Sequence, residues 1–251
     1  MTFRDLYRWS PPLAITGWIH AVLLVAALVL LPLDSRQVLG ISPWIKPIKF
    51  NASIILYVWA MAWYVGQLVD RPLLRKLAWT ISIAMLAETA CIQLQAIRGT
   101  TSHFNNATPF DGIVFGVMGM FIAINTVAAA WIAVLYFRET PALTPAVLLG
   151  ARLGLVLFLI GTVEGGMMIA NKAHTVGGPD GGPGLPFLTW STKFGDLRWA
   201  HFIGMHGLQG LPLVGWLVGN KKLVAGAFAA GLAAVLVALV IALQGRPMIA
   251  L

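Results

Sequence analysis

The sequence predicts an all-α, polytopic membrane protein, a compact bundle of about seven transmembrane helices that forms one domain over residues 1–251. Hydrophobic residues make up 59% of the chain and charged residues 10%. The mean hydropathy of +0.83 lies outside the range of soluble domains. Apolar runs recur that are long enough to cross a hydrocarbon core of about 30 Å, which takes about 20 helical residues. Charges, Pro and Gly separate these runs and leave no room for a soluble domain.

The apolar runs define the helices in chain order. The first run follows Arg4 and Arg8, is too long for a signal peptide and lacks a small-residue cleavage site, so we expect it to remain as an anchor. The long segments DSRQVLGISPWIKPIKF, RGTTSHFNNATPFDG and NKAHTVGGPDGGPGLPFLTWSTKFGDLR follow the first, third and fifth runs. The short segments VDRPLLRK, FRETPALTP and NKK follow the second, fourth and sixth. The expected spans are 12–33, 48–68, 74–97, 110–137, 143–171, 197–219 and 222–244.

The connecting segments decide the expected orientation. With the N-terminus in the cytoplasm, the inner segments carry nine Lys and Arg residues and the outer segments eight, so the positive-inside rule scarcely separates the two orientations. The long segments are chemically varied, and basic residues that serve a site there do not count as topology signals. We therefore expect the N-terminus inside and the C-terminus outside.

Composition narrows the classes of partner. The single cysteine, Cys91, excludes an internal disulfide and a cysteine-built metal site. The net charge of +8 does not indicate nucleic acid binding, because the basic residues stand singly at helix ends. The expected partners are membrane lipids, a quinone or another small-molecule ligand, and a second copy of the chain in a homo-oligomer.

Histidines interrupt stretches that are otherwise typical of lipid-facing helix. An ionisable side chain in hydrocarbon costs about 3 kcal/mol unless a partner or cavity receives it, so such residues indicate a site. His201 and His206 lie about 140° apart around a helix and point to different neighbours. His20 is the expected partner of one of them, which favours bis-imidazole haem ligation across two helices. The alternative is interhelical hydrogen bonding by each histidine.

Two carboxylates also lie within apolar runs. Glu88 shares a helix face with Cys91 and Gln95. Glu164 lies beside Gly161, which allows close approach of a neighbouring helix. We expect both carboxylates to face the bundle interior, where they carry protons, pair with an arginine or join histidines on a metal.

The three long segments supply further candidates. Lys46 and Lys49 oppose the dipole at a helix start beside Trp44, which favours a bound anion; the alternative is that both lysines reach lipid headgroups. His103 and Asp111 offer a ligand and a proton acceptor, or belong to a capped surface turn. The third segment is rich in Gly and Pro and suits a cap over the helix ends, with a flexible tether as the alternative. Asp196 in that segment is expected at the N-cap or first turn of the sixth span.

The segments PWIKPIKF, RGTTSHFN, GGPDGGPGLPFLTWST and GDLRWAHFIGMHGLQ resemble signatures of an uncharacterised family of bacterial multi-pass inner-membrane proteins. The resemblance covers most of the chain and implies a single-domain bundle in the bacterial inner (cytoplasmic) membrane, with a periplasmic C-terminus in the expected orientation. It implies no particular activity.

A second, weaker likeness is to the seven-helix hydrolases of the alkaline-ceramidase and adiponectin-receptor type, which implies a zinc-dependent hydrolase. The chain has HxxxxH on its sixth span where that family has HxxxH on its last helix. The residue types of that family's site occur here at Ser102, His103, Asp111, His201 and His206.

Our leading hypothesis is a haem- or metal-binding membrane protein with a redox or electron-transfer role near the outer face, with haem b as cofactor and zinc or another transition metal as the alternative. The expected metal ligands are His20, His103, His201 and His206. The expected contacts to an anionic group or cofactor are Lys46, Lys49, Arg98, Arg198 and Trp44. The expected catalytic or proton-handling groups are Glu88, Glu164 and Asp111. The alternatives are a transporter or lipid-binding protein with a polar interior pathway, and an intramembrane metal-dependent hydrolase.

Overall fold

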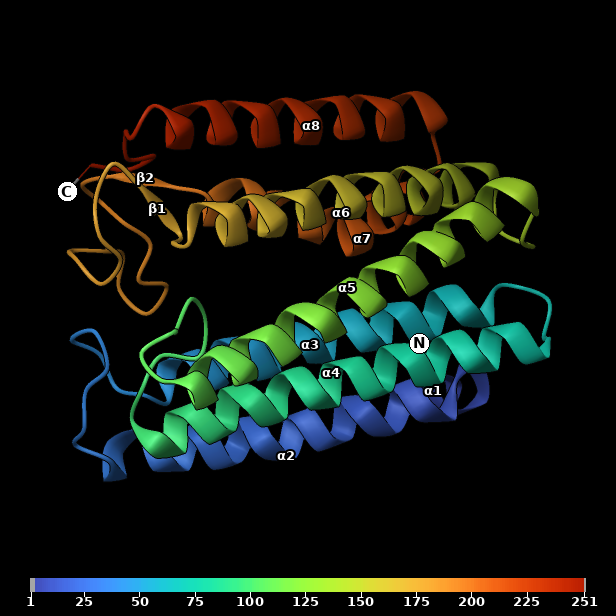
Figure 1. The fold of residues 1–251 in the computed structure, drawn as a ribbon. Coiled ribbons are helices and arrows are strands. Elements are labelled where there is room, and N and C mark those ends of the chain that lie inside the picture. The colour runs from blue at the N-terminus through green and yellow to red at the C-terminus, as the bar shows by residue number, and fades with distance from the viewer. Residues whose placement is uncertain (1–2, 251) are drawn as a thin grey trace. The chain divides into compact units, whose positions relative to one another are not determined.

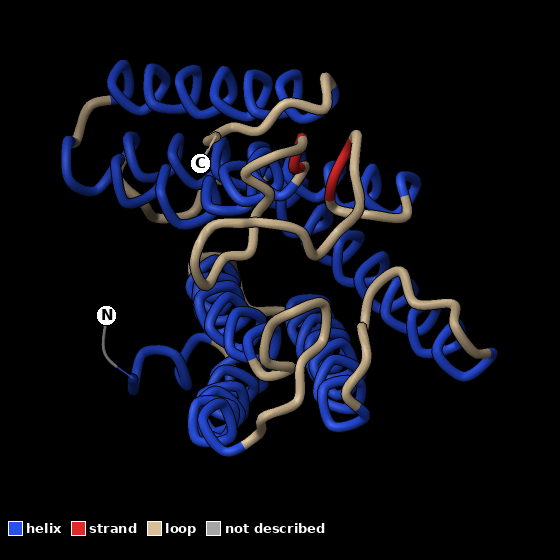
Figure 2. The backbone as a smooth tube through the Cα atoms, turned by 90° about the vertical axis from the view of Figure 1, so that its left-hand side faces the viewer, coloured by secondary structure: helices blue, strands red, loops and turns tan. Residues whose placement is uncertain are grey.

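A computed structural model describes residues 3–250, whose regular structure is almost entirely helical (Figures 1 and 2). The contacts divide the chain into two compact units, Met1–Leu135 and Tyr136–Leu251, which we call unit 1 and unit 2. A single domain over the whole chain stays a prediction. The elements are α1 (Phe3–Trp9), α2 (Pro11–Leu33), α3 (Ile45–Gly66), α4 (Pro72–Arg98), α5 (Pro109–Arg138), α6 (Pro145–Asn171), β1 (Thr175–Val176), β2 (Gly195–Asp196), α7 (Arg198–Val218) and α8 (Lys221–Leu243).

Each of the seven expected spans is a helix, with ends that differ from the prediction by at most three residues. Within residues 3–250, six of these helices, α2 to α6 and α8, are long and apolar enough to cross a membrane. The 21-residue α7 is not among them, and the polar side chains of His201, His206 and Gln209 lower its hydropathy. The chain is therefore a multi-pass helical membrane protein. A crossing by α7, the kind of membrane and the side of each terminus stay predictions.

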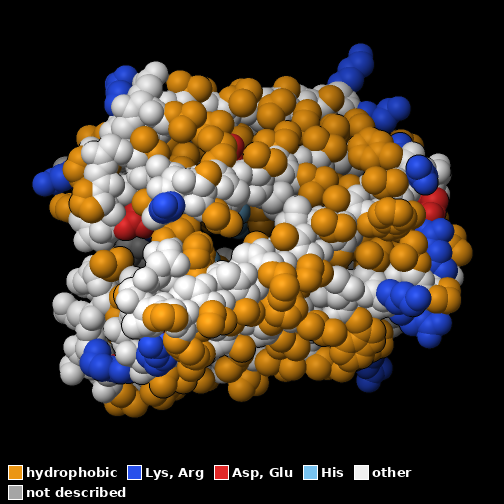
Figure 3. Space-filling view, viewed as in Figure 1, with side chains coloured by type: hydrophobic (Ala, Val, Ile, Leu, Met, Phe, Trp, Pro, Cys, Tyr) orange, Lys and Arg blue, Asp and Glu red, His pale blue; other side chains and the backbone are white. Residues whose placement is uncertain are grey.

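The surface agrees with a membrane environment. On the face drawn in Figure 3, hydrophobic side chains cover the helices along their length, and most of the visible Lys and Arg side chains lie toward helix ends. Large apolar side chains such as Val22, Val127 and Trp216 are about two-thirds exposed, at 68%, 67% and 71%. Apolar surface of this extent is rare in soluble monomers and is typical of membrane contact.

Proline and left-handed residues set the helix bounds. A proline at the first helical position costs little, because its missing N–H has no partner within the helix. Gly99 and Gly219 end α4 and α7 with positive φ values of 69° and 61°, which glycine adopts without strain. Four of the helices begin at such a proline, namely α2 at Pro11, α4 at Pro72, α5 at Pro109 and α6 at Pro145.

Unit 1 is built around α2, α3 and α4, which pack on one another. The short helix α1 packs on α2 and α3 through Leu6, which is 1% exposed. This helix was not expected from the sequence, because its charged residues break any apolar run. A buried hydrogen bond from Tyr57 Oη to Asn125 Oδ1, 2.8 Å long, connects α3 to α5.

Unit 2 is organised by the close packing of α6 on α7, with α8 against both. A Cβ atom on Gly204 would lie 2.6 Å from Gly161 Cα, and one on Gly161 would lie 2.7 Å from Met205 N. Only glycine therefore allows the two backbones to approach this closely. Leu157 and Val235 contribute to the apolar cluster that holds α8 in place.

Gly161→Ala should destabilise unit 2, because the added methyl group forces α6 and α7 apart. We expect the free energy of unfolding to fall by about 1–3 kcal/mol, the usual cost of overpacking, and the melting temperature in detergent to fall with it. Gly166→Ala is the matched control, since its added Cβ meets no atom within 4 Å. Equal melting temperatures for the two variants would show that glycine at position 161 is not needed for packing.

Candidate functional site

The expected ligand contact Trp44 lies at one end of unit 1, where α2 ends and α3 begins. It is 6% exposed, and its indole Nε1 donates to Asp34 Oδ2 at 2.9 Å. Arg36 donates to the same carboxylate through Nε at 2.9 Å and Nη2 at 2.6 Å, and through Nη1 to Ile97 O at 2.8 Å. The hydrogen bonds from Arg36 hold the pKa of Asp34 well below its usual range, against the opposing effect of partial desolvation. These bonds hold the end of α4 beside the start of α3, and they use the Trp44 N–H within the protein.

The expected anion contact Arg98 is paired with Asp111. Arg98 Nη1 lies 2.5 Å from both Asp111 Oδ1 and Gln95 Oε1, and its guanidinium lies 4.7 Å from the ring centroid of Phe110. Gln95 Nε2 donates to Asp111 Oδ1 at 2.9 Å, and Thr108 Oγ1 donates to Oδ2 at 2.6 Å. Both carboxylate oxygens of Asp111 are thus hydrogen-bonded, and the observed role of the group is to fix the start of α5 against α4.

Glu88 and His103 face one another near the same end of unit 1. Glu88 is 4% exposed, its Oε1 lies 3.7 Å from His103 Nε2, and its Oε2 is buried without a hydrogen-bond partner within residues 3–250. The other ring nitrogen, His103 Nδ1, lies 3.1 Å from Ser102 Oγ. Ser102 therefore orients the imidazole so that Nε2 points to the carboxyl, and the pair is a buried acid opposite a titratable base.

Aromatic rings surround His103. The ring centroids of Phe50, Phe104 and Phe115 lie 5.5, 6.0 and 6.2 Å from that of the imidazole. Phe104 has a φ of 55°, a left-handed backbone that is rare for a bulky residue and that stores strain next to the imidazole. The apolar wall limits access of water to the carboxyl–imidazole pair.

Lys46 and Lys49 lie partly buried in the first two turns of α3. The Lys46 ammonium is 5.7 Å from the ring centroid of Phe50, and it acts electrostatically on Glu88. The positive charge that the helix dipole disfavours therefore interacts favourably with a buried carboxyl. An anion site at these lysines stays a prediction.

His20 connects α2 to α4. It is fully buried, with Nδ1 at 2.7 Å from Thr16 O and Nε2 at 2.8 Å from Thr89 Oγ1. Because a carbonyl oxygen only accepts, Nδ1 carries the proton, and Nε2 accepts from the threonine hydroxyl. Both ring nitrogens are used, which is the interhelical hydrogen bonding considered as the alternative to metal ligation.

The remaining intramembrane candidates lie in unit 2. His201 Nδ1 is 2.7 Å from Gly161 O, and His206 Nδ1 is 2.8 Å from Phe202 O. Each ring retains Nε2 as its remaining acceptor. Glu164 is 3% exposed, and its Oε2 is buried with no hydrogen-bond partner in the part of the chain that the structure describes.

Metal binding gains no support from this arrangement. Within residues 3–250, no group of three or more His, Cys, Asp and Glu side chains is placed to hold a metal ion. Haem b, zinc and another transition metal stay predictions, as do the ligand roles of the four histidines.

The segment between α6 and α7 is an ordered cap. Its strands β1 and β2 pair antiparallel, with Thr175 opposite Asp196. Asp196 accepts hydrogen bonds from Ser191 N at 2.7 Å and from Arg198 N at 3.0 Å, and its ion pair with Arg198 Nη2 is 2.6 Å long. The guanidinium that was expected to contact an anion is thus paired inside the cap. The prediction that Asp196 is the N-cap or a first-turn residue was wrong by one position, because Leu197 is the N-cap of α7 and Asp196 belongs to β2.

A second carboxylate organises the turn of this cap. Asp180 accepts from Thr175 N at 3.0 Å and Thr175 Oγ1 at 2.8 Å, and His174 Nδ1 lies 2.6 Å from Oδ2. Burial acts to raise the pKa of Asp180, but the hydrogen bonds from His174 and Thr175 outweigh it and hold that pKa well below its usual range. The sequence HTVGGPD contains the signal for this contact, since Gly-Gly-Pro between opposite charges predicts a tight turn. The contact between His174 and Asp180 was not predicted from the sequence.

The Ser102–His103–Glu88 arrangement was also missed as a unit. The sequence shows the first two as neighbours, but nothing in its spacing indicates which ring nitrogen faces α4. No protein-family model, curated protein or solved structure matches the chain.

Asp180→Asn should destabilise the protein most at neutral pH. The carboxylate has a lowered pKa in the folded state, so its contribution is fully present above the unfolded pKa of about 4 and is lost as pH falls through the lower folded pKa. We expect the difference in melting temperature between wild type and variant to shrink below about pH 4. The control is Asp70→Asn, at an exposed position after α3. A pH-independent difference for Asp180→Asn would contradict a charged, paired Asp180.

Proposed function

We propose that the protein is a proton-coupled transporter of a small organic or inorganic anion, in which Glu88 and His103 bind the coupling proton and Lys46 attracts the anion. The observation that carries the proposal is the Glu88 carboxyl, buried within a membrane helix with one oxygen unpartnered and the other 3.7 Å from an imidazole nitrogen. Ionisable groups inside membrane helices are costly and commonly mark ion or proton pathways.

The pair has two electrically balanced states. In one, Glu88 is a neutral acid and His103 is a neutral base; in the other, a carboxylate faces an imidazolium. A proton moves between them over a short path with no net change in charge, so neither state leaves an isolated charge in the apolar wall. Release of that proton leaves the Glu88 carboxylate beside a neutral imidazole, so uptake and release change the net charge of the pair by one, and the positive charge of Lys46 offsets the carboxylate in the deprotonated state.

Lys46 couples the proton to an anion. While Glu88 is ionised, the lysine ammonium interacts with it. When Glu88 is protonated, its attraction for the ammonium is lost, so an anion at the start of α3 meets less competition for the positive charge of Lys46, and the helix dipole there also attracts negative charge. Proton and anion binding therefore favour each other, which is the linkage that a symporter needs.

We favour transport over haem binding because one of the expected haem ligands is already used in hydrogen bonds. His20 uses both ring nitrogens in hydrogen bonds between helices. Haem binding remains a prediction that an optical spectrum of the purified protein would test.

Glu88→Gln should uncouple anion binding from pH. The experiment measures uptake of radiolabelled inorganic phosphate and of a panel of small dicarboxylates into proteoliposomes, with and without an inward proton gradient. Wild type should accumulate one of these anions when the gradient is present. Glu88→Gln mimics the protonated acid, so it should still bind the anion but lose the stimulation by protons, which we expect to be about tenfold.

Lys46→Gln should instead lose anion binding at every pH. Lys221→Gln, at the start of α8, and Asp70→Asn serve as controls for loss of a cation or a carboxylate elsewhere. Undiminished proton stimulation in Glu88→Gln would rule out Glu88 as the coupling group. Infrared titration gives a readout that needs no transported solute. The band of the protonated Glu88 carboxyl should be present in wild type and absent in Glu88→Gln. In His103→Gln, the pH at which this band disappears should change.

A further inference from the structure

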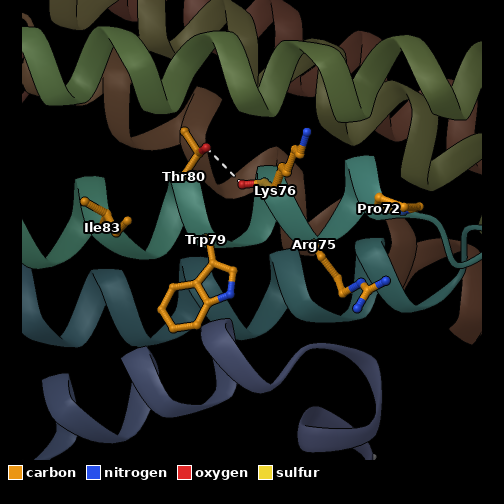
Figure 4. Close-up of a pocket in the computed structure, with 6 residues that line it drawn as sticks. All are labelled: Pro72, Arg75, Lys76, Trp79, Thr80 and Ile83. Atoms are coloured by element: carbon orange, nitrogen blue, oxygen red, sulfur yellow. Dashed lines mark hydrogen bonds between the residues drawn. The ribbon is translucent and has the colours of Figure 1, made fainter.

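A shallow, open hollow of about 600 Å³ lies along the first half of α4 in unit 1 (Figure 4). All of its lining residues belong to that helix, so it follows one helix face rather than an interface. The lining residues are Pro72, Arg75, Lys76, Trp79, Thr80 and Ile83. None of them takes part in the proposed proton and anion site.

The chemistry of the hollow changes along the helix axis. Arg75 and Lys76, near the start of α4, are exposed, and within residues 3–250 neither side chain makes a hydrogen bond or ion pair. One turn further on, Trp79 is 54% exposed, and Ile83 after it is 52% exposed. The hollow is thus cationic at the helix start and apolar toward the middle of the span.

Figure 4 shows how the side chains frame the hollow. Arg75 and Trp79 extend to one side of the α4 ribbon, and Lys76 and Thr80 extend to the other. Thr80 Oγ1 donates to Lys76 O at 2.9 Å, so its hydroxyl is held against the helix backbone. The two cations therefore extend to different sides of the same turn of α4, and Trp79 and Ile83 follow in the next two turns.

We propose that this hollow binds an anionic phospholipid, with the phosphate between Arg75 and Lys76 and an acyl chain along Trp79 and Ile83. Guanidinium and ammonium groups are the usual protein donors to phosphate oxygens. Tryptophan is enriched at the level of lipid headgroups, where its N–H meets the polar layer and its ring meets hydrocarbon. The order of charges and apolar groups along α4 matches the order of headgroup and tail in a phospholipid.

The apolar half of the hollow distinguishes a lipid from free phosphate. Inorganic phosphate would satisfy the two cations but would leave Trp79 and Ile83 without a contact. A phospholipid covers both halves at once, and each basic residue near an anionic headgroup strengthens binding severalfold. Negative charge on the lipid is required, since a zwitterionic headgroup brings its own cation to the site.

Native mass spectrometry of the full-length protein in detergent, titrated with phosphatidylglycerol or phosphatidylcholine, tests the site. Wild type should retain phosphatidylglycerol more tightly than phosphatidylcholine. The double variant Arg75→Gln/Lys76→Gln should bind phosphatidylglycerol about tenfold more weakly and lose the preference between the two lipids. Trp79→Ala should weaken the binding of both lipids to the same degree, because it removes a contact with the acyl chain and leaves the two cations in place.

The matched control is Lys221→Gln/Lys222→Gln, which removes two exposed adjacent cations from the start of α8, where no tryptophan follows. It should retain the wild-type preference. Equal losses in the two double variants would overturn the proposal in favour of a general attraction to positive helix ends. Displacement of phosphatidylglycerol by inorganic phosphate, or equal affinity of wild type for both lipids, would overturn it as well.

Discussion

The rest of the structure depends on one constraint of the hydrocarbon environment, which offers no water to polar groups, so each such group needs a partner inside the protein. Unit 1 meets this constraint in part with bonds that run between helices. His20 joins α2 to Thr89 on α4, and Tyr57 joins α3 to Asn125 on α5. The same bonds that satisfy these side chains also fix which helix faces which. A substitution that removed one partner would leave the other buried and unpaired, at a cost of about 1–3 kcal/mol.

The buried carboxylates differ in how fully they meet this need for hydrogen-bond partners. Asp111 and Asp196 have hydrogen-bond donors on both oxygens. Glu88 and Glu164 each keep a buried oxygen without a partner within residues 3–250. Asn51 Oδ1 on α3 and Ser82 Oγ on α4 are likewise buried without a hydrogen-bond partner among the described residues, so an unpaired oxygen alone does not indicate function. The two carboxyl groups differ because they are ionisable, and ionisable groups inside membrane helices commonly mark proton or ion pathways. In unit 1 the neighbouring imidazole and ammonium supply that function in the proposed mechanism.

The helices could be predicted from the sequence because their signals are local: apolar length, proline at the first position and glycine after the last. The site could be predicted only in part. Its residue types stood out, but the sequence paired Arg98 and Arg198 with an anion or an intramembrane carboxylate, and the structure pairs them with Asp111 and Asp196. Those partners come together through turns at helix starts, which helical periodicity does not describe. The direction of each imidazole nitrogen is likewise set by tertiary contacts, so ligand and structural histidines are indistinguishable in sequence.

The position of Lys46 decides whether proton binding and anion binding favour or oppose each other in the proposed mechanism. A cation in the first turns of α3 opposes the helix dipole, by a few tenths to about 1 kcal/mol, and Glu88 on α4 is a negative group near enough to offset it. An anion at the same place would offset it too, so anion and ionised Glu88 compete for one ammonium. Such competition makes the anion bind better to the protonated protein, and linkage then requires that the anion favour protonation to the same degree. Exchange of a proton against an anion would need the opposite dependence, with Glu88 supporting the anion rather than replacing it. Competition between the anion and ionised Glu88 for one ammonium is therefore the feature of the proposed mechanism that favours symport over antiport.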